Sequence, residues 1–515
     1  MINLPKAKLF IIVVIFLLLL AALLAGRMGY GFRSSPEKSY PEYSTGLERV
    51  SCWFKADFNW PKSECYYMHV PEDHSHPEGR TISFPVLIFR SNALVQKKSP
   101  LLHLGGGGPG GPMYLDFKFS VQTHLDYLND MSIRQGRDLY IIDPRGTGLS
   151  RPLLSCDSYV KNERQRLTKN LAIRKELALA DQDYFDCIKR FQAADIDLSQ
   201  YNTLAVAHDV EALRKAANIE RWVLFGVSYS ATYAQFIAAE YPSSIESMIL
   251  DSIKFINLKM HHNFIDQTMA SYHAMFSYCD ISPNCKRPIN NIEQRIDKLY
   301  TELNKKPAVV PALDYNSGQT INVVLNGGRF VNTLLNNVYG LSLFSDLPKI
   351  VTELEAGEHA TIVPYVENYI AFLLDATYGD VSSAAHYCFE DKAYTDFDII
   401  RSKIPLLPEG HIRDQAELFL DWPDYCAAMQ VEPGPVKMAA KTQTDIPTLF
   451  LHGEFDTVTR LADVKSQLNG FNNARLKIYP SSHAVLGSDE CAEFVAAKFV
   501  ANYRIKQGEL TCQRR

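Results

Sequence analysis

The 515-residue sequence has neither the excess of basic residues typical of a nucleic-acid-binding protein nor the cysteine spacing typical of a zinc protein. Its 53 lysines and arginines are outnumbered by 58 aspartates and glutamates, giving a formal charge of −5. Without a basic stripe, that balance argues against nucleic acid as the main partner. No CxxC pair occurs, and histidines do not cluster near cysteines, so we expect no metal site. The 46% hydrophobic content predicts a globular protein with a large core.

The amino terminus carries a long apolar run. Lys6 and Lys8 precede the run from Leu9 to Gly26, and Arg27 closes it. Eighteen helical residues span about 27 Å, close to the hydrocarbon thickness of a bilayer. This length favours an uncleaved membrane anchor; a cleaved signal peptide is the alternative. In either case the preceding lysines predict that the remaining chain lies outside the cytoplasm.

The even number of cysteines agrees with export of the chain from the cytoplasm. The sequence contains ten cysteines, and in an oxidising compartment an even number predicts disulfides rather than free thiols. We therefore expect a periplasmic or secreted catalytic part, tethered to the membrane by the amino-terminal helix.

Short apolar runs alternate with helical patterns along most of the chain. Such runs are typical of strands buried on both faces of a parallel sheet; they are 101–104, 139–142, 223–225, 248–250 and 448–451. Residues 81–89 alternate apolar and polar, as an edge or half-buried strand would. The pattern predicts an α/β fold with right-handed crossovers.

The pattern changes between about residues 255 and 440. Apolar residues at helical spacing in 292–303 predict an amphipathic helix, and we find no convincing buried strand in this stretch. We expect a mainly helical insertion. The predicted organisation is a cytoplasmic stub, the anchor or signal segment, a linker, a first core part, the insertion and a second core part, at 1–8, 9–26, 27–45, 46–254, 255–440 and 441–515.

A candidate nucleophile, Ser228, lies between an apolar strand and a helical stretch, in the sequence Gly226-Val227-Ser228-Tyr229-Ser230. A nucleophile elbow requires a strand, a sharp turn and a helix, with small residues two positions before and after the serine. Gly226 meets this condition fully, and Ser230 meets it less well than glycine would.

Two candidate partners follow in the required chain order of acid and then histidine. Asp456 comes just after the strand at 448–451, and His483 follows the next apolar strand. The carboxyl ends of parallel strands are where such sites are built. Asp456 could instead be a turn residue and His483 an ordinary loop histidine, but their shared order with Ser228 favours a triad.

A glycine-rich segment, Gly105 to Pro112, follows the strand at 101–104. Glycines allow backbone N–H groups to approach a developing oxyanion closely. A phosphate-binding loop is the rival interpretation, but the Lys-Ser/Thr of a Walker motif and a helix-opening GxGxxG are both absent here. We expect the N–H groups of Gly107 and Tyr229 to form an oxyanion hole.

These motifs together resemble the secreted tripeptidyl and prolyl aminopeptidase family of α/β-hydrolases. The resemblance rests on Gly107-Gly108-Pro109-Gly110, on Asp143-Pro144-Arg145-Gly146-Thr147-Gly148-Leu149-Ser150, on the serine turn and on the segment Asp456-Thr457-Val458-Thr459. It runs from Cys52 onward and is weakest in the insertion. Ser230, Arg460 and Ala484 depart from the residues usual in the family.

The resemblance implies an α/β-hydrolase fold in which residues 255–440 cap the site, and an acyl-enzyme mechanism without a metal or organic cofactor. Together with local loop closure, it favours five disulfides: Cys52–Cys65, Cys156–Cys187, Cys279–Cys285, Cys388–Cys426 and Cys491–Cys512. An aminopeptidase must also bind a substrate ammonium. Glu390 and Asp391 are candidates for this role; a solvated acidic turn is the alternative.

Three functions fit the sequence. The first is a serine exopeptidase acting on free peptide amino termini, and the second is an esterase or amidase acting on small acyl substrates. An inert membrane-tethered binding protein is the third and least favoured, because it would not need a complete triad.

Overall fold

The computed structural model describes residues 46–512, except for 93–97, 259–262, 282–289, 391–394, 408, 419, 421–422 and 436–440. The predicted anchor at 9–26 lies outside the described residues. Within the described part, no helix combines the length and apolarity needed to cross a membrane.

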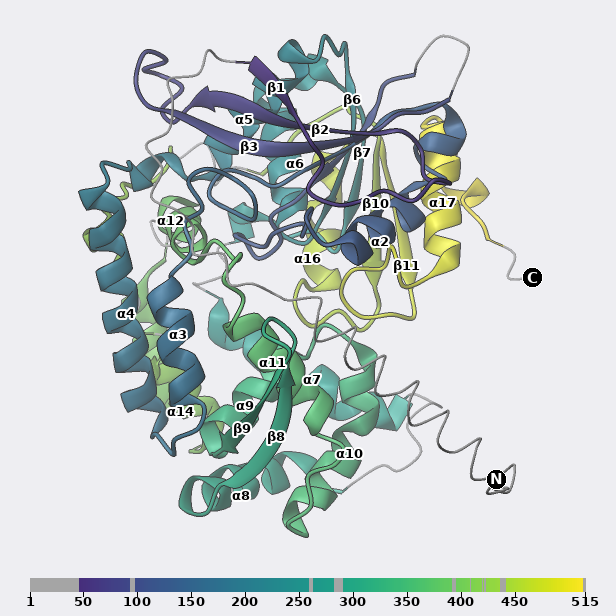
Figure 1. The fold of residues 1–515 in the computed structure, drawn as a ribbon. Coiled ribbons are helices and arrows are strands. Elements are labelled where there is room, and N and C mark those ends of the chain that lie inside the picture. Colours follow the sequence, from purple (N-terminus) through teal and green to yellow (C-terminus); the bar gives the residue numbers. More distant parts are fainter. Residues whose placement is uncertain are drawn as a thin grey trace, which may run out of the picture.

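A nine-stranded sheet forms the centre of the molecule (Figure 1), in the order β1-β2-β3-β5-β4-β6-β7-β10-β11. The first three strands pair antiparallel, and β3 pairs antiparallel with β5, whereas the neighbours from β5 to β11 pair parallel. The strands are β1 (Gly46–Val50), β2 (Ser63–Pro71), β3 (Thr81–Phe89), β4 (Leu101–Leu104), β5 (Leu139–Ile142), β6 (Trp222–Val227), β7 (Ile245–Asp251), β10 (Thr448–Gly453) and β11 (Ala474–Tyr479).

Both faces of the interior parallel strands are buried because helices cover each face, whereas the edge strand β11 is largely exposed or half-buried. In β6, Leu224 packs with α5 and α6 on one face, while Val223 and Phe225 pack with α2 and α17 on the other. This two-sided burial explains why the strands are continuous apolar runs in the sequence. The helices of this core are α2 (Lys118–Leu128), α5 (Thr203–Ala216), α6 (Ser230–Glu240), α16 (Leu461–Gln467) and α17 (Glu490–Ala501).

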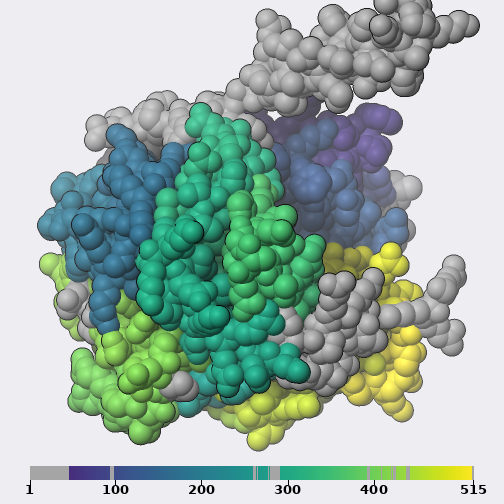
Figure 2. Space-filling model, turned by 90° about the horizontal axis from the view of Figure 1, so that it is seen from below, coloured from purple at the N-terminus to yellow at the C-terminus, as the bar shows by residue number. Residues whose placement is uncertain are grey.

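A second hydrophobic cluster lies below the sheet in Figure 1 and joins α3 and α4 to the predicted insertion. Figure 2, viewed onto this side, shows the blue segment of α3 and α4 beside the green insertion. The helices here are α3 (Asp157–Arg166), α4 (Ile173–Ala193), α7 (Phe264–Ile281), α8 (Ile292–Lys305), α9 (Gly327–Asn336), α10 (Leu341–Glu355), α11 (Val363–Leu373), α12 (Asp380–Glu390), α13 (Phe397–Lys403), α14 (His411–Leu418) and α15 (Pro423–Met429).

Two expectations about strands were wrong. The β3 strand is an interior strand between β2 and β5, and residues 82–89 are all buried, so it is neither an edge strand nor a half-buried one. The insertion also contains an antiparallel hairpin of β8 (Ala308–Asp314) and β9 (Gln319–Leu325). Only alternate hairpin residues are buried, among them Val310 and Val323. In sequence, β8 is apolar but contains Pro311, which does not suit an interior strand, and β9 carries polar residues at exposed positions.

Four of the five expected disulfides are formed: Cys52–Cys65, Cys156–Cys187, Cys388–Cys426 and Cys491–Cys512. The fifth pair, Cys279–Cys285, involves side chains outside the described part of the chain. The Cys388–Cys426 bond joins α12 to α15, and the Cys491–Cys512 bond ties α17 to the carboxyl-terminal tail. Because disulfides persist in oxidising compartments, these bonds indicate an extracytoplasmic location.

Candidate active site

Ser228 occupies the sharp turn between β6 and α6. Its φ of 57° lies in the left-handed region, which is costly for a residue with a side chain. The turn is held by the Ser228 N–H, which donates to the Asp251 carbonyl at 2.9 Å. A Cβ at Gly226 would lie 2.6 Å from the Ala231 Cα, so only glycine lets the strand and helix approach this closely.

The departure at Ser230 is accommodated within the same turn. The Ser230 hydroxyl accepts a hydrogen bond from the Val227 N–H at 2.8 Å and donates to the Val227 carbonyl at 2.9 Å. Its side chain therefore folds back on the strand end and leaves the turn intact.

Asp456 and His483 meet after β10 and β11. The His483 Nδ1 atom lies 3.1 and 3.0 Å from the two Asp456 carboxylate oxygens. The carboxylate also accepts hydrogen bonds from the N–H groups of Val458 and Thr459, each at 2.9 Å. Burial raises the pKa of Asp456, but the facing His483 charge and these hydrogen bonds outweigh burial and hold that pKa below its usual value.

The other ring nitrogen of His483 is in a position to accept a proton. Its Nε2 atom is buried and has no hydrogen-bond partner within the described residues. The ring is held on one side by Tyr339, whose centroid lies 5.3 Å away in an edge-on arrangement. Because Asp456 binds Nδ1, Nε2 is the nitrogen left to accept a proton.

The glycine loop after β4 presents the expected backbone donors. Gly106 and Gly108 have φ values of 86° and 104°, and the Gly111 N–H closes the turn on the Gly107 carbonyl at 2.9 Å. A Cβ built at Gly107 would meet no atom within 4 Å, so the space above this residue is open. Neither the Gly107 N–H nor the Tyr229 N–H donates to an acceptor in the described chain. Both donors suit a developing oxyanion.

Asp143, at the end of β5, supports the glycine loop. Its fully buried carboxylate accepts hydrogen bonds from the Met113 N–H at 2.6 Å and the Leu149 N–H at 3.0 Å. Burial raises the pKa of Asp143 to about 7, although these N–H groups oppose the rise. The motif around Asp143 contributes to the family resemblance, but no role for this residue was predicted from the sequence.

Asp251, at the end of β7, joins the serine turn to the histidine loop. Its carbonyl accepts from Ser228, while its carboxylate accepts from the N–H groups of Val485 at 3.0 Å and Leu486 at 2.7 Å. Burial raises the pKa of Asp251 to about 6, against the lowering effect of these N–H groups and His483. The only feature of the sequence that could have pointed to Asp251 is its position at the end of an apolar strand.

The two acids expected to bind a substrate ammonium have different outcomes. Glu390, at the end of α12, is only 1% exposed, and its carboxylate accepts hydrogen bonds from the Thr203 N–H and the Tyr229 hydroxyl. Its oxygens thus bind the Thr203 backbone and the Tyr229 side chain behind the serine turn, and these contacts give no support to an ammonium-binding role. Asp391 lies outside the described residues.

The sheet order, the strained serine and the acid–histidine pair define the class of the protein: it is an α/β-hydrolase. The sequence comparisons agree, since residues 105–284 match the alpha/beta hydrolase fold family and residues 416–512 match the family described as TAP-like protein. The chain therefore belongs to the α/β-hydrolases and has a TAP-like carboxyl-terminal part.

Several curated proteins are distantly similar. The serine protease Hip1 of Mycobacterium tuberculosis is 23% identical over 463 residues, which cover 85% of each chain. The tripeptidyl aminopeptidase of Streptomyces coelicolor is 25% identical over 213 residues, covering 40% of this chain and 38% of that protein. The putative hydrolase YuaR of Escherichia coli is 25% identical over 269 residues, covering 48% and 50%. Together with the family matches, these similarities class the chain as a serine hydrolase.

Proposed function

We propose that this protein is a serine exopeptidase that removes residues or short peptides from free peptide amino termini. The observation that carries the proposal is the strained Ser228 at the β6–α6 turn, with the Asp456–His483 pair held to the same region through Asp251. The choice of a peptide substrate is supported by the similarity to a serine protease and a tripeptidyl aminopeptidase.

In the proposed mechanism, His483 Nε2 takes the proton of the Ser228 hydroxyl as its oxygen attacks the scissile carbonyl. Asp456 orients the ring through Nδ1 and stabilises the imidazolium. The N–H groups of Gly107 and Tyr229 stabilise the oxyanion. His483 then gives its proton to the leaving amine, and water, deprotonated by His483, hydrolyses the acyl-enzyme.

The decisive experiment is Ser228→Ala. We expect turnover to fall by orders of magnitude, near 10⁶, and labelling by a fluorophosphonate to disappear, while the thermal unfolding midpoint stays close to wild type. Residual turnover above about a hundredth of wild type, at unchanged fold, would contradict the assignment.

An esterase or amidase with the same triad is the second candidate, because one scaffold supports many acyl substrates. Comparing kcat/KM for peptides with free and blocked amino termini against small acyl esters separates the two functions. Preference for the free amine supports the exopeptidase, and preference for the ester supports the alternative.

We also propose that the segment at 9–26 tethers the catalytic part to the outer side of a membrane. Its apolar length and the preceding lysines support this arrangement. The described disulfides are consistent with the same compartment.

A further inference from the structure

A cavity of about 440 Å³ lies between α4 and the segment from α11 to α12, with α15 at one end. Its volume falls within the range typical of small-ligand sites. Leu177, Ala180, Asp181, Tyr184 and Ile188 of α4 line it, and this spacing places them on one face of the helix. The opposite wall includes Asp380, Ala384 and Tyr387.

The cavity adjoins the glycine loop of the candidate active site. Gly108, which follows the oxyanion donor Gly107, is part of its lining. The Tyr387 hydroxyl donates to the Gly108 carbonyl at 2.5 Å, and the Tyr378 hydroxyl donates to the Pro109 carbonyl at 2.6 Å. The cavity is therefore adjacent to the loop that carries the expected oxyanion donor Gly107.

The cavity lies on the acyl side of the scissile bond. The leaving amine must receive its proton from His483, so the leaving part of the substrate lies toward that ring. Neither His483 nor its neighbour Tyr339 lines the cavity, whereas Gly108 of the oxyanion loop does. In an exopeptidase acting at free amino termini, the acyl part carries the substrate ammonium.

The charged residues that line the cavity favour the binding of a cation. Asp181 and Asp380 are its acidic lining residues, and no lysine, arginine or histidine is among the described residues that line it. Apart from Ser383 and Gly108, the rest of the wall is apolar or aromatic, with several tyrosines. Such a wall accepts an apolar side chain, while the two carboxylates favour an ammonium and disfavour a substrate carboxylate.

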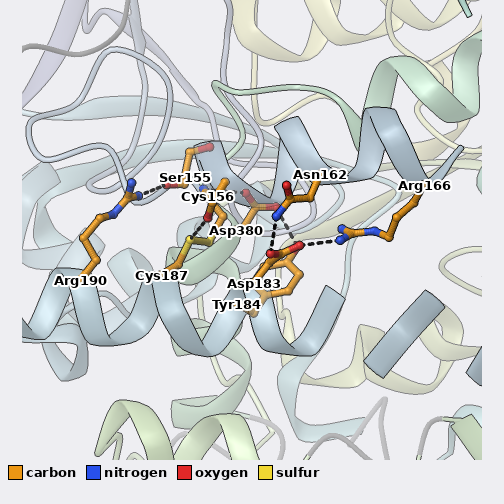
Figure 3. Close-up of a disulfide and its surroundings, with 10 residues drawn as sticks. Ser155, Cys156, Asn162, Arg166, Asp183, Tyr184, Cys187, Arg190 and Asp380 are labelled. Atoms are coloured by element: carbon orange, nitrogen blue, oxygen red, sulfur yellow. Dashed lines mark hydrogen bonds and ion pairs between the residues drawn. A yellow bond between two sulfur atoms is a disulfide. The ribbon is translucent and has the colours of Figure 1, made fainter. Parts of the chain in front are cut away.

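Asp380 is held firmly in place. Its carboxylate accepts hydrogen bonds from the Tyr184 hydroxyl at 3.1 Å and from the Cys156 N–H at 3.2 Å. Figure 3 shows Asp380 beside Tyr184 and the Cys156–Cys187 disulfide. Burial raises the pKa of Asp380 to about 7, and a bound ammonium would favour its ionised form.

Asp181 accepts a hydrogen bond from the Tyr425 hydroxyl, which also lines the cavity, and the other acids of α4 have different surroundings. In Figure 3, Asp183 contacts Arg166 and Asn162 and does not line the cavity. Asp186, one turn further on, has a side chain that is 59% exposed. The helix therefore offers Asp186 as a matched control for Asp181.

We propose that this cavity binds the amino-terminal residue of the peptide substrate, with its ammonium facing Asp181 and Asp380 and an apolar or aromatic side chain against the tyrosine and aliphatic walls. This inference rests on the proposed exopeptidase function. It assigns the ammonium to residues outside the Glu390–Asp391 pair and names the class of peptide that the enzyme prefers.

The test compares chromogenic anilides of one, two and three residues that begin with phenylalanine, each with a free or an acetylated amino terminus. The measured quantity is the ratio of kcat/KM for the free to that for the acetylated form. We expect wild type and Asp186→Asn to share a high ratio. Asp181→Asn and Asp380→Asn should each lower it by about tenfold or more, because each removes a negative charge that faces the ammonium.

A second variant probes the cavity without changing charge. Ala180→Leu adds bulk to the α4 wall, so it should raise KM for substrates beginning with phenylalanine more than for those beginning with alanine. This variant keeps the proposal testable if Asp380→Asn fails to fold, since Asp380 also holds Tyr184 and Cys156 in place.

The possible results distinguish a failure of the cavity assignment from a failure of the proposed function. If wild type prefers the free amine but Asp181→Asn and Asp380→Asn keep the ratio of Asp186→Asn, the cavity assignment is overturned and the exopeptidase function stands. If wild type is labelled by a fluorophosphonate but does not favour the free amine, both the exopeptidase function and the cavity assignment fail. Preference for long-chain acyl esters would identify the cavity as an acyl-chain site instead.

Discussion

At the scale of single residues, Asp251 connects two parts of the candidate site that are distant in sequence. The carboxylate binds the backbone just after His483, and the carbonyl binds the backbone of Ser228. Asp251 is thus a positioning residue: it fixes the loops that carry the reacting groups.

We predict that Asp251→Asn lowers kcat/KM by roughly 10- to 100-fold, because one amide oxygen cannot replace the two carboxylate oxygens that accept the N–H groups of Val485 and Leu486. Peptide turnover and the rate of fluorophosphonate labelling measure this loss. Asp251→Glu, which keeps both oxygens, should retain more activity than Asp251→Asn.

The same variant should change how stability depends on pH. The pKa of Asp251 is about 6 in the folded protein, above its ordinary value of 3.8. The folded state therefore keeps this proton to a higher pH than the unfolded state does, and wild type loses stability relative to Asp251→Asn as pH rises from about 4 to about 6. The relative change should be of the order of 1–3 kcal/mol. Denaturant unfolding at pH 4.5 and 7 measures it, and a difference independent of pH would contradict the assigned pKa.

At the scale of elements, the β6–α6 turn depends on the absence of a side chain at one position. A Cβ at Gly226 would lie 2.7 Å from both the Ala231 nitrogen and the Ser230 carbonyl oxygen. Since both neighbours are backbone atoms, neither can rotate away.

Gly226→Ala is therefore expected to lower the free energy of unfolding by about 1–3 kcal/mol and to abolish fluorophosphonate labelling. The control is Gly46→Ala, because a Cβ at that edge-strand position meets no atom within 4 Å. Thermal unfolding and labelling of both variants are the measurements. Equal effects of the two substitutions would show that the close contact at the turn is unimportant.

At the scale of the whole molecule, the disulfides and the amino-terminal segment make one joint prediction. The protein should fractionate with membrane, be digested by protease from the extracytoplasmic side, and give a non-reducing peptide map with five cross-links, including Cys279–Cys285. This result is expected because an apolar segment of this length anchors a chain and an oxidising compartment pairs its cysteines. An amino terminus near Gly29 or beyond would contradict the tether, and free thiols at most positions would contradict export.

Local pattern was sufficient to predict much of the fold. Residues 101–104 and 139–142 were predicted with the same bounds as β4 and β5, because strands buried on both faces are apolar throughout. The β8–β9 hairpin was missed because Pro311 interrupts the apolar run of β8 and polar residues occupy the exposed positions 319, 320 and 322 of β9.

The sequence by itself determined the chemistry proposed here. Ser228, Asp456 and His483 stand out because a nucleophile elbow and strand-end loops have local requirements that leave local signals. Only the tertiary structure decided which other groups surround them. Asp251 meets Val485 more than 230 residues along the chain, and the cavity joins Asp181 of α4 to Asp380 of α12. No local pattern encodes such contacts, because they exist only once the sheet and the helices around it have packed together.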